Sequence, residues 1–202
     1  METTVVAPGN TSLNARVGAV ALAACAFLTL LLSHFAASLA PLRLLCIALS
    51  AFAAWCFCDE MGMRKPLNRA GFVFFVIAAL AKVQVICGVA PDYAGRYYLL
   101  SSSFALLALL FWSVAFLHRQ RALKVVGAVG AVAAFAPIVA LVVGHLVVGV
   151  GAALGVQALL AAGHGGPVDT TFVKLVERLF GLWAYAAAWF LWRGHIRLAQ
   201  PS

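Results

Sequence analysis

The residues with the clearest chemical potential are ionisable side chains inside long apolar runs. Lys82 lies in AALAKVQVICG, residues 78–88, and Glu177 lies in LVERLFGLW, residues 175–183. A charge near the centre of a bilayer costs about 3 kcal/mol or more, so it is kept where it pairs or lines a polar path. A paired ammonium and carboxylate can couple to a proton or an anion. Lys82 and Glu177 are therefore the first candidates for function.

Depth in the membrane connects these two residues. With the spans given below and a rise of about 1.5 Å per residue, they differ in depth by about 7 Å. A lysine side chain can cover most of that distance, and Glu177 is the one acidic residue well inside an apolar run. We predict a Lys82–Glu177 ion pair that links the third and sixth spans. Gln84 points to another face of its helix and is expected to bond to a neighbouring helix.

Other polar residues share the outer half of the membrane with this pair. The depth calculation places His34 and His145 there. In the last span, polar and small residues recur at helical spacing on one face, namely Lys174, Glu177, Arg178, Gly181, Tyr185 and Ala188. Trp183 lies off this face, where it can meet lipid. The pattern predicts an outward-facing polar cavity; the alternative is a helix start whose charges meet lipid headgroups. The candidate cavity residues are Lys82, Glu177, His145, His34, Arg178 and Tyr185.

Histidine and cysteine raise the possibility of redox or metal chemistry. His34 and His145 lie on different spans at similar depth, so haem ligation through them is an alternative if their imidazoles face each other. The stretch CFCDE, residues 56–60, lacks the second ligand pair of a structural zinc site, so we predict no metal there. The five cysteines lie within or at the ends of apolar runs, which argues against a disulfide framework. No familiar hydrolase, metalloprotease or phosphate-loop motif is present, so a non-enzymatic role is favoured.

The elements that must position these residues are membrane-spanning helices. The chain is 65% hydrophobic and 10% charged, with a mean hydropathy of +1.04, whereas a soluble domain is about half apolar and a quarter charged. Apolar runs of about 20 residues can cross a bilayer as helices. We predict an all-α integral membrane protein in which residues 1–202 form one domain, with an outer or re-entrant segment at 148–171. The predicted spans are 17–38, 40–58, 70–90, 97–117, 125–147 and 172–193.

Basic residues set the orientation of this six-helix transmembrane bundle. With cytoplasmic N- and C-termini, the inner segments carry nine arginines and lysines and the outer ones carry four, which fits the excess of cytoplasmic positive charge in membrane proteins. The net charge of +8 is thus explained without a nucleic-acid partner. The abundance of alanine and glycine suggests a bacterial inner membrane.

Aromatic and small residues are expected to shape the contacts of the bundle. An aromatic belt at the two membrane surfaces is predicted for Tyr93, Tyr97, Tyr98, Trp112 and Trp192. Gly127 and Gly130 in the fifth span predict close contact with neighbouring helices.

Three classes of function remain open from the sequence. The first is a carrier, channel or ligand-binding subunit for a small solute or ion. The second is a membrane anchor or accessory subunit, with the polar pairs serving assembly with a protein partner or a homo-oligomer. The third is a membrane redox enzyme with haem, or a lipid-modifying enzyme.

Overall fold

The chain folds into a bundle of α-helices. The computed structural model describes residues 13–32, 40–62, 65–89, 93–117, 121–146 and 171–193. Within these ranges lie six α-helices, whose bounds are α1 Leu13–Leu32, α2 Ala40–Met61, α3 Pro66–Ile86, α4 Ala94–Leu117, α5 Arg121–Leu146 and α8 Thr171–Trp192. The all-helical prediction is confirmed. Almost all of the predicted outer segment 148–171 lies outside the described residues.

Four of these helices are long and apolar enough to cross a membrane. They are α1 to α4, each with at least 19 residues of high mean hydropathy. The apolar part of α5 covers Leu123–Val139, which is shorter. Helix α8 carries Lys174, Glu177 and Arg178 in its first half. The helices therefore support an integral membrane protein.

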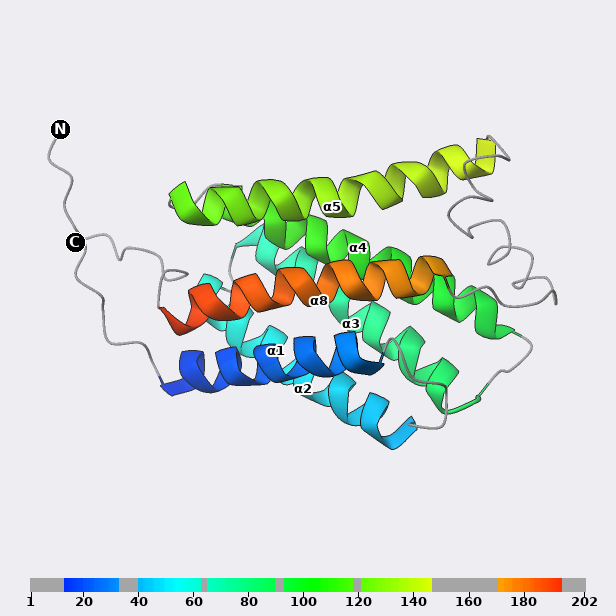
Figure 1. Ribbon diagram of the computed structural model, residues 1–202, viewed down its shortest axis with the longest axis horizontal. Coiled ribbons are helices and arrows are strands. Elements are labelled where there is room, and N and C mark those ends of the chain that lie inside the picture. The colour runs from blue at the N-terminus through cyan, green and yellow to red at the C-terminus, as the bar shows by residue number, and fades with distance from the viewer. Residues whose placement is uncertain are drawn as a thin grey trace, which may run out of the picture.

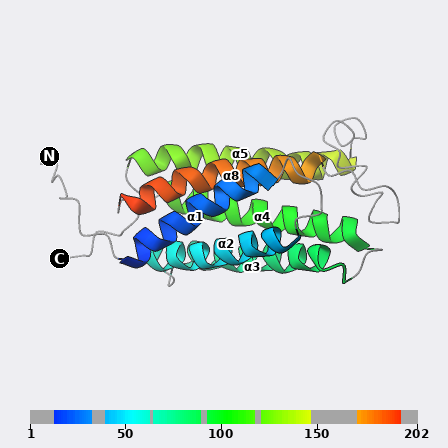
Figure 2. The ribbon, with the colours of Figure 1, turned by 60° about the horizontal axis from the view of Figure 1, so that its bottom comes forward.

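The helices are arranged as a ring. Each helix contacts the next along the chain, and α8 contacts α1, which closes the ring. A further contact between α4 and α8 leaves α5 on the outside of a smaller ring of α1, α2, α3, α4 and α8. Figures 1 and 2 show α5 at one side of the bundle, next to α4 and α8. Successive helices alternate in direction, so α1 begins and α8 ends at the same end of the bundle (Figure 1).

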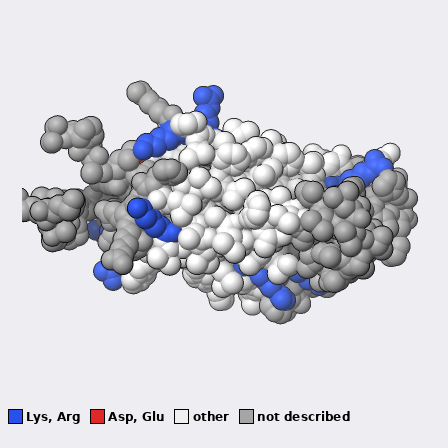
Figure 3. Space-filling model, turned by 90° about the horizontal axis from the view of Figure 1, so that it is seen from above, with Lys and Arg blue, Asp and Glu red and all other residues white. Residues whose placement is uncertain are grey.

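The outer surface of the bundle is apolar between its two ends. Large hydrophobic side chains are exposed along the helices, among them Val20, Phe27, Phe52, Val73, Leu80, Val132, Phe135 and Leu182. On the face seen in Figure 3, uncharged residues cover a broad band of the described surface, and the Lys and Arg side chains lie at its ends and along its lower edge. Soluble monomers rarely expose an apolar surface of this extent. The band has the character expected of a surface that meets lipid.

One half of the bundle has an aromatic core. Phe57 of α2 is 2% exposed and makes edge-on contacts with Trp112, Phe116 and Trp183, with ring centroids 5.4 to 5.9 Å apart. The indoles of Trp112 and Trp183 stack at 5.9 Å. We call this region, near the start of α1 and the end of α8, the packed half. The predicted belt position of Trp112 and the lipid-facing position of Trp183 are wrong, because an indole that suits an interface also suits a core.

Glycines allow α5 to approach this core closely. A Cβ atom at Gly130 would lie 2.3 Å from Ser113 Oγ and 2.6 Å from Trp183 Cδ1. One at Gly127 would lie 2.6 Å from the Ser113 carbonyl oxygen. All three distances are too short for real contacts of a Cβ atom, so these positions require glycine as long as α5 stays in place. The predicted close contact through small residues is confirmed.

Candidate functional site

The other half of the bundle contains a cavity. Helices α1, α2, α3, α4 and α8 all contribute to its wall, whereas none of the α5 side chains that the structure describes, residues 123–139, belongs to it. Its volume is about 120 Å³, several times the ~10–15 Å³ that one water molecule requires. We call this region, near the end of α3 and the start of α8, the cavity half. The cavity is large enough to hold several waters or a small ligand.

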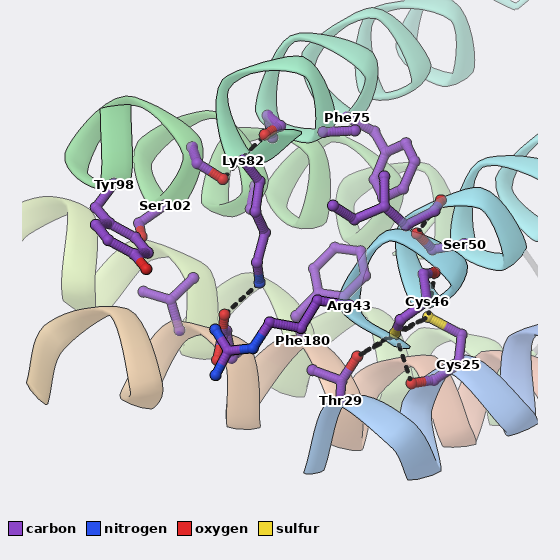
Figure 4. A pocket seen from close by; sticks show the side chains of 17 residues that line it. Cys25, Thr29, Arg43, Cys46, Ser50, Phe75, Lys82, Tyr98, Ser102 and Phe180 are labelled. Carbon is purple, nitrogen blue, oxygen red and sulfur yellow. Dashed lines mark hydrogen bonds and ion pairs between the residues drawn. The ribbon is translucent and has the colours of Figure 1, made fainter. Parts of the chain in front are cut away.

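Lys82 and Glu177 meet across this cavity. The Lys82 ammonium of α3 donates a hydrogen bond to Glu177 Oε1 of α8, and the two form an ion pair (Figure 4). The structure thus contains the contact that the depth argument predicts. The side chains are 25% and 19% exposed and line the cavity. Because both side chains stay partly exposed to this open space, water that enters it can reach them, which lowers the desolvation cost of both charges.

Arg43 of α2 adds a second cation to the wall. In Figure 4 its side chain enters the cavity, as does that of Lys82. Among the residues of the wall that the structure describes, Glu177 is the one carboxylate and faces two cations, so this described part carries one net positive charge. Tyr98 and Ser102 of α4 bring hydroxyl groups to the same wall. These groups together can hold an anion.

The opposite wall carries thiols and hydroxyls. Cys25 and Thr29 come from α1, and Cys46 and Ser50 come from α2. The Cys25 and Cys46 Sγ atoms lie 3.5 Å apart, and Thr29 Oγ1 lies 3.3 Å from Cys46 Sγ. Ser50 Oγ donates to the Ile47 carbonyl of its own helix at 2.8 Å. The two thiols are thus in contact with each other and face the same space as the ion pair.

Aromatic rings close the cavity toward the packed half. Phe75 of α3 and Phe180 of α8 line its inner part, with ring centroids 6.1 Å apart and planes at 24°. Beyond them is a second void of about 20 Å³, which ends on Phe57, Trp112 and Trp183. The polar space therefore stops at the aromatic core. Among the helices that the structure describes, no continuous polar path runs the length of the bundle.

Two of the other four candidate residues, Arg178 and Tyr185, do not belong to this wall, and the structure does not describe the side chains of the remaining two. Arg178 and Tyr185 are exposed on α8, where Val176, Glu177 and Phe180 provide the lining. His34 lies outside the described residues. His145 belongs to α5, and its side chain lies outside what the structure describes. Haem ligation by this histidine pair therefore stays a prediction.

Sequence reasoning missed three residues of the site. Arg43 was counted only as an outer charge, although its position near the start of α2 gives it a depth similar to that of Glu177. Cys25 and Cys46 are not among the candidate residues, because the sequence argues only against a disulfide framework. The sequence does contain a signal for Arg43, because a charged side chain one turn inside the start of a span can extend into the outer half of the membrane. None was available for the cysteines, because their neutral side chains suit a core equally well.

No protein-family model, no curated protein and no solved structure matches this chain.

Proposed function

We propose that this protein binds a small organic anion in the cavity, as a carrier or as the ligand-binding subunit of a membrane complex. The observation that carries the proposal is the Lys82–Glu177 ion pair in a cavity wall that also holds Arg43. A chain that needed only stability would gain little from a buried ion pair, because apolar packing of similar volume is often as stable. A cavity that binds a charged ligand has a use for it.

The charge of the wall selects an anion. Lys82 and Arg43 outnumber Glu177, so the cavity attracts one negative charge. An incoming carboxylate would accept hydrogen bonds from Arg43 and compete with Glu177 for the Lys82 ammonium. Glu177 then repels the ligand, which keeps binding reversible. A proton taken up by Glu177 would favour the bound state, which is a route to proton coupling.

The part of the cavity wall that Phe75 and Phe180 form favours a ligand with an apolar group. Phe75 and Phe180 lie parallel enough to cover a flat or narrow hydrocarbon group. A short-chain or aromatic monocarboxylate matches both walls, with its carboxylate toward Arg43 and its apolar part toward the rings. The aromatic core beyond the cavity supports a binding site or carrier over an open channel.

The topology belongs to the proposal as well. We infer six spans with cytoplasmic termini in a bacterial inner membrane, so the cavity half faces outward. The alternating helix directions and the charge of the loops support this orientation. A carrier of this kind would need the aromatic core to open before the ligand could leave on the cytoplasmic side.

Reagents of opposite charge test the proposal without knowledge of the ligand. Ser102 is 4% exposed and lines the cavity, whereas Cys87 is exposed beyond the end of α3. Two variants are compared, each with one thiol: Ser102→Cys without native cysteines, and the chain with Cys87 alone. Anionic and cationic methanethiosulfonates are reacted with both. We expect the anionic-to-cationic rate ratio to be on the order of tenfold higher at Ser102→Cys, the effect of one nearby charge in a polar protein site.

Two further variants identify the source of this selectivity. Adding Arg43→Gln to Ser102→Cys should bring the ratio down to that of Cys87. Adding Arg178→Gln, which removes an exposed charge outside the wall, should leave it unchanged. Equal ratios at Ser102→Cys and Cys87 would contradict the anion site. If Ser102→Cys reacts with neither reagent until the protein is denatured, the accessory-subunit role replaces the proposal.

A further inference from the structure

Two cysteines on neighbouring helices face each other in the cavity wall. Besides the 3.5 Å contact between their Sγ atoms, each thiol lies against the backbone of the other residue. Cys25 Sγ is 3.5 Å from the Cys46 carbonyl oxygen, and Cys46 Sγ is 3.7 Å from the Cys25 carbonyl oxygen. This reciprocal arrangement requires α1 and α2 to approach closely at this level. Neither helix has to move far for the two sulfurs to meet.

The geometry is close to that of a disulfide. A disulfide needs its sulfurs about 2.05 Å apart and its Cβ atoms about 3.8 Å apart. The two Sγ atoms, now 3.5 Å apart, would have to approach by roughly 1.5 Å for the bond to form. The other buried cysteines differ in this respect. Cys56 and Cys58 are two residues apart on α2, so their side chains point to different sides of one helix and cannot bond to each other.

The cavity also gives a reagent access to the thiols. Cys25 and Cys46 are 7% and 8% exposed, and both belong to the cavity wall. A reactant therefore reaches them through the cavity rather than from lipid. Cys56 and Cys58 are equally buried but do not belong to this wall.

We propose that Cys25 and Cys46 are a redox pair that forms a reversible intramolecular disulfide by exchange with a small disulfide, RSSR. The thiolate of one cysteine attacks RSSR, forms a mixed disulfide and releases RS⁻. The thiolate of the other attacks the cysteine sulfur of that mixed disulfide and releases the second RS⁻. The two protons from the protein thiols end on the two released RSH molecules. Two electrons pass from the protein to RSSR.

The bond would change the wall that faces the ion pair. It joins α1 to α2, draws Cys46 Sγ away from its 3.3 Å contact with Thr29 Oγ1, and removes two thiol donors from the cavity. The inference does not depend on the proposed anion ligand, because the chemistry involves the two cysteines alone.

Counting thiols before and after oxidation tests the proposal. In a variant with Cys56, Cys58 and Cys87 replaced by serine, only Cys25 and Cys46 remain. Membranes are treated with a small acyclic disulfide such as cystamine, quenched, denatured and reacted with a maleimide mass tag. We expect two tags per chain without oxidation, none after it, and two again after reduction, all on a monomer band, with an oxidised chain about 2 Da lighter rather than heavier by two RS groups.

A matched pair of thiols provides the control. In the variant with Cys25, Cys46 and Cys87 replaced by serine, the same treatment should leave two tags on Cys56 and Cys58. If the Cys25/Cys46 chain also keeps two tags, or loses them only as a cross-linked dimer, the proposal is overturned. Should the triple variants fail to fold, the intact mass of the wild-type chain decides. A loss of about 2 Da with Cys25 and Cys46 peptides linked supports the proposal, and its absence after oxidation overturns it.

Discussion

The two halves of this bundle are made by the same helices and packed in different ways. In the packed half, Phe57 and Trp112 fill the space between α2, α4 and α8 with aromatic rings. In the cavity half, Lys82, Arg43 and Glu177 face a space of about 120 Å³ that side chains do not fill. Polar and small groups keep that space open, while rings close it beyond Phe75 and Phe180. Close aromatic packing and open cavity space are thus separated along the bundle axis.

The largest effect is expected in the packed half. Phe57→Ala removes a fully buried ring that contacts three others, and should lower the free energy of unfolding by about 3–5 kcal/mol. Phe52→Ala on the same helix removes an exposed ring and serves as the control. Unfolding in mixed micelles of increasing SDS content measures both. Similar losses for the two variants would contradict the assignment of the core to this half.

The next effect tests the ion pair of the cavity half. Glu177→Gln leaves the Lys82 ammonium without its carboxylate, and should cost roughly 1–3 kcal/mol, less than a fully buried pair because the cavity is polar. Lys82→Gln together with Glu177→Gln should recover most of the loss, as should exchange of the two residues. The same SDS titration gives the values. If the double variant is no more stable than Glu177→Gln alone, the two residues are not coupled.

A third change acts on the approach of α5 to the packed half. Gly130→Ala places a Cβ atom against Ser113 and Trp183, so α5 has to shift, at a cost of about 1–3 kcal/mol. Val129→Leu, at an exposed position of the same helix, should change stability little. Because Gly130 and the other described side chains of α5 lie outside the cavity wall, the anionic-to-cationic rate ratio at Ser102→Cys should survive Gly130→Ala. If Gly130→Ala instead lowers this ratio to that at Cys87, a change in the packed half alters the cavity half, and the two halves are not independent.

The smallest effect concerns a hydrogen bond at the edge of the cavity. Ser101 Oγ of α4 donates to the Ala78 carbonyl of α3 at 2.9 Å. Ser101→Ala should cost about 0.6 kcal/mol, the average for such bonds between membrane helices. Ser103→Ala, which lies outside the cavity wall, is the comparison. A loss above 2 kcal/mol would show that Ser101 has a larger part in holding the cavity open.

The sequence predicts those contacts whose absence would cost the folded protein much free energy. A lysine and a glutamate inside apolar runs are expensive unless they meet, so depth alone was enough to pair Lys82 with Glu177. Glycine in the fifth span likewise predicts close contact. The rotation of each helix about its axis is set by packing between neighbours, and hydropathy does not reveal it. Arg178 and Tyr185 were therefore assigned to a cavity wall that Val176 and Phe180 occupy.

Residues with two compatible environments could not be placed from the sequence. An indole suits both a membrane surface and a core, so Trp112 and Trp183 were misplaced. Cysteine counts as an apolar residue within a hydrophobic run, so nothing in the sequence predicts the contact between Cys25 and Cys46. Only their positions on α1 and α2 in three dimensions bring them together.

The most direct test of this account compares two serines of α4, one in each half. Ser102 lines the cavity and Ser113 is 0% exposed beside Trp183 and Gly130. Each is changed to cysteine in a chain without native cysteines, and intact cells are treated with a membrane-impermeant thiol reagent. The account predicts that Ser102→Cys is labelled from outside, whereas Ser113→Cys is labelled only after denaturation. Equal labelling of the two, or labelling of neither before denaturation, would contradict an outward-facing cavity above a packed core.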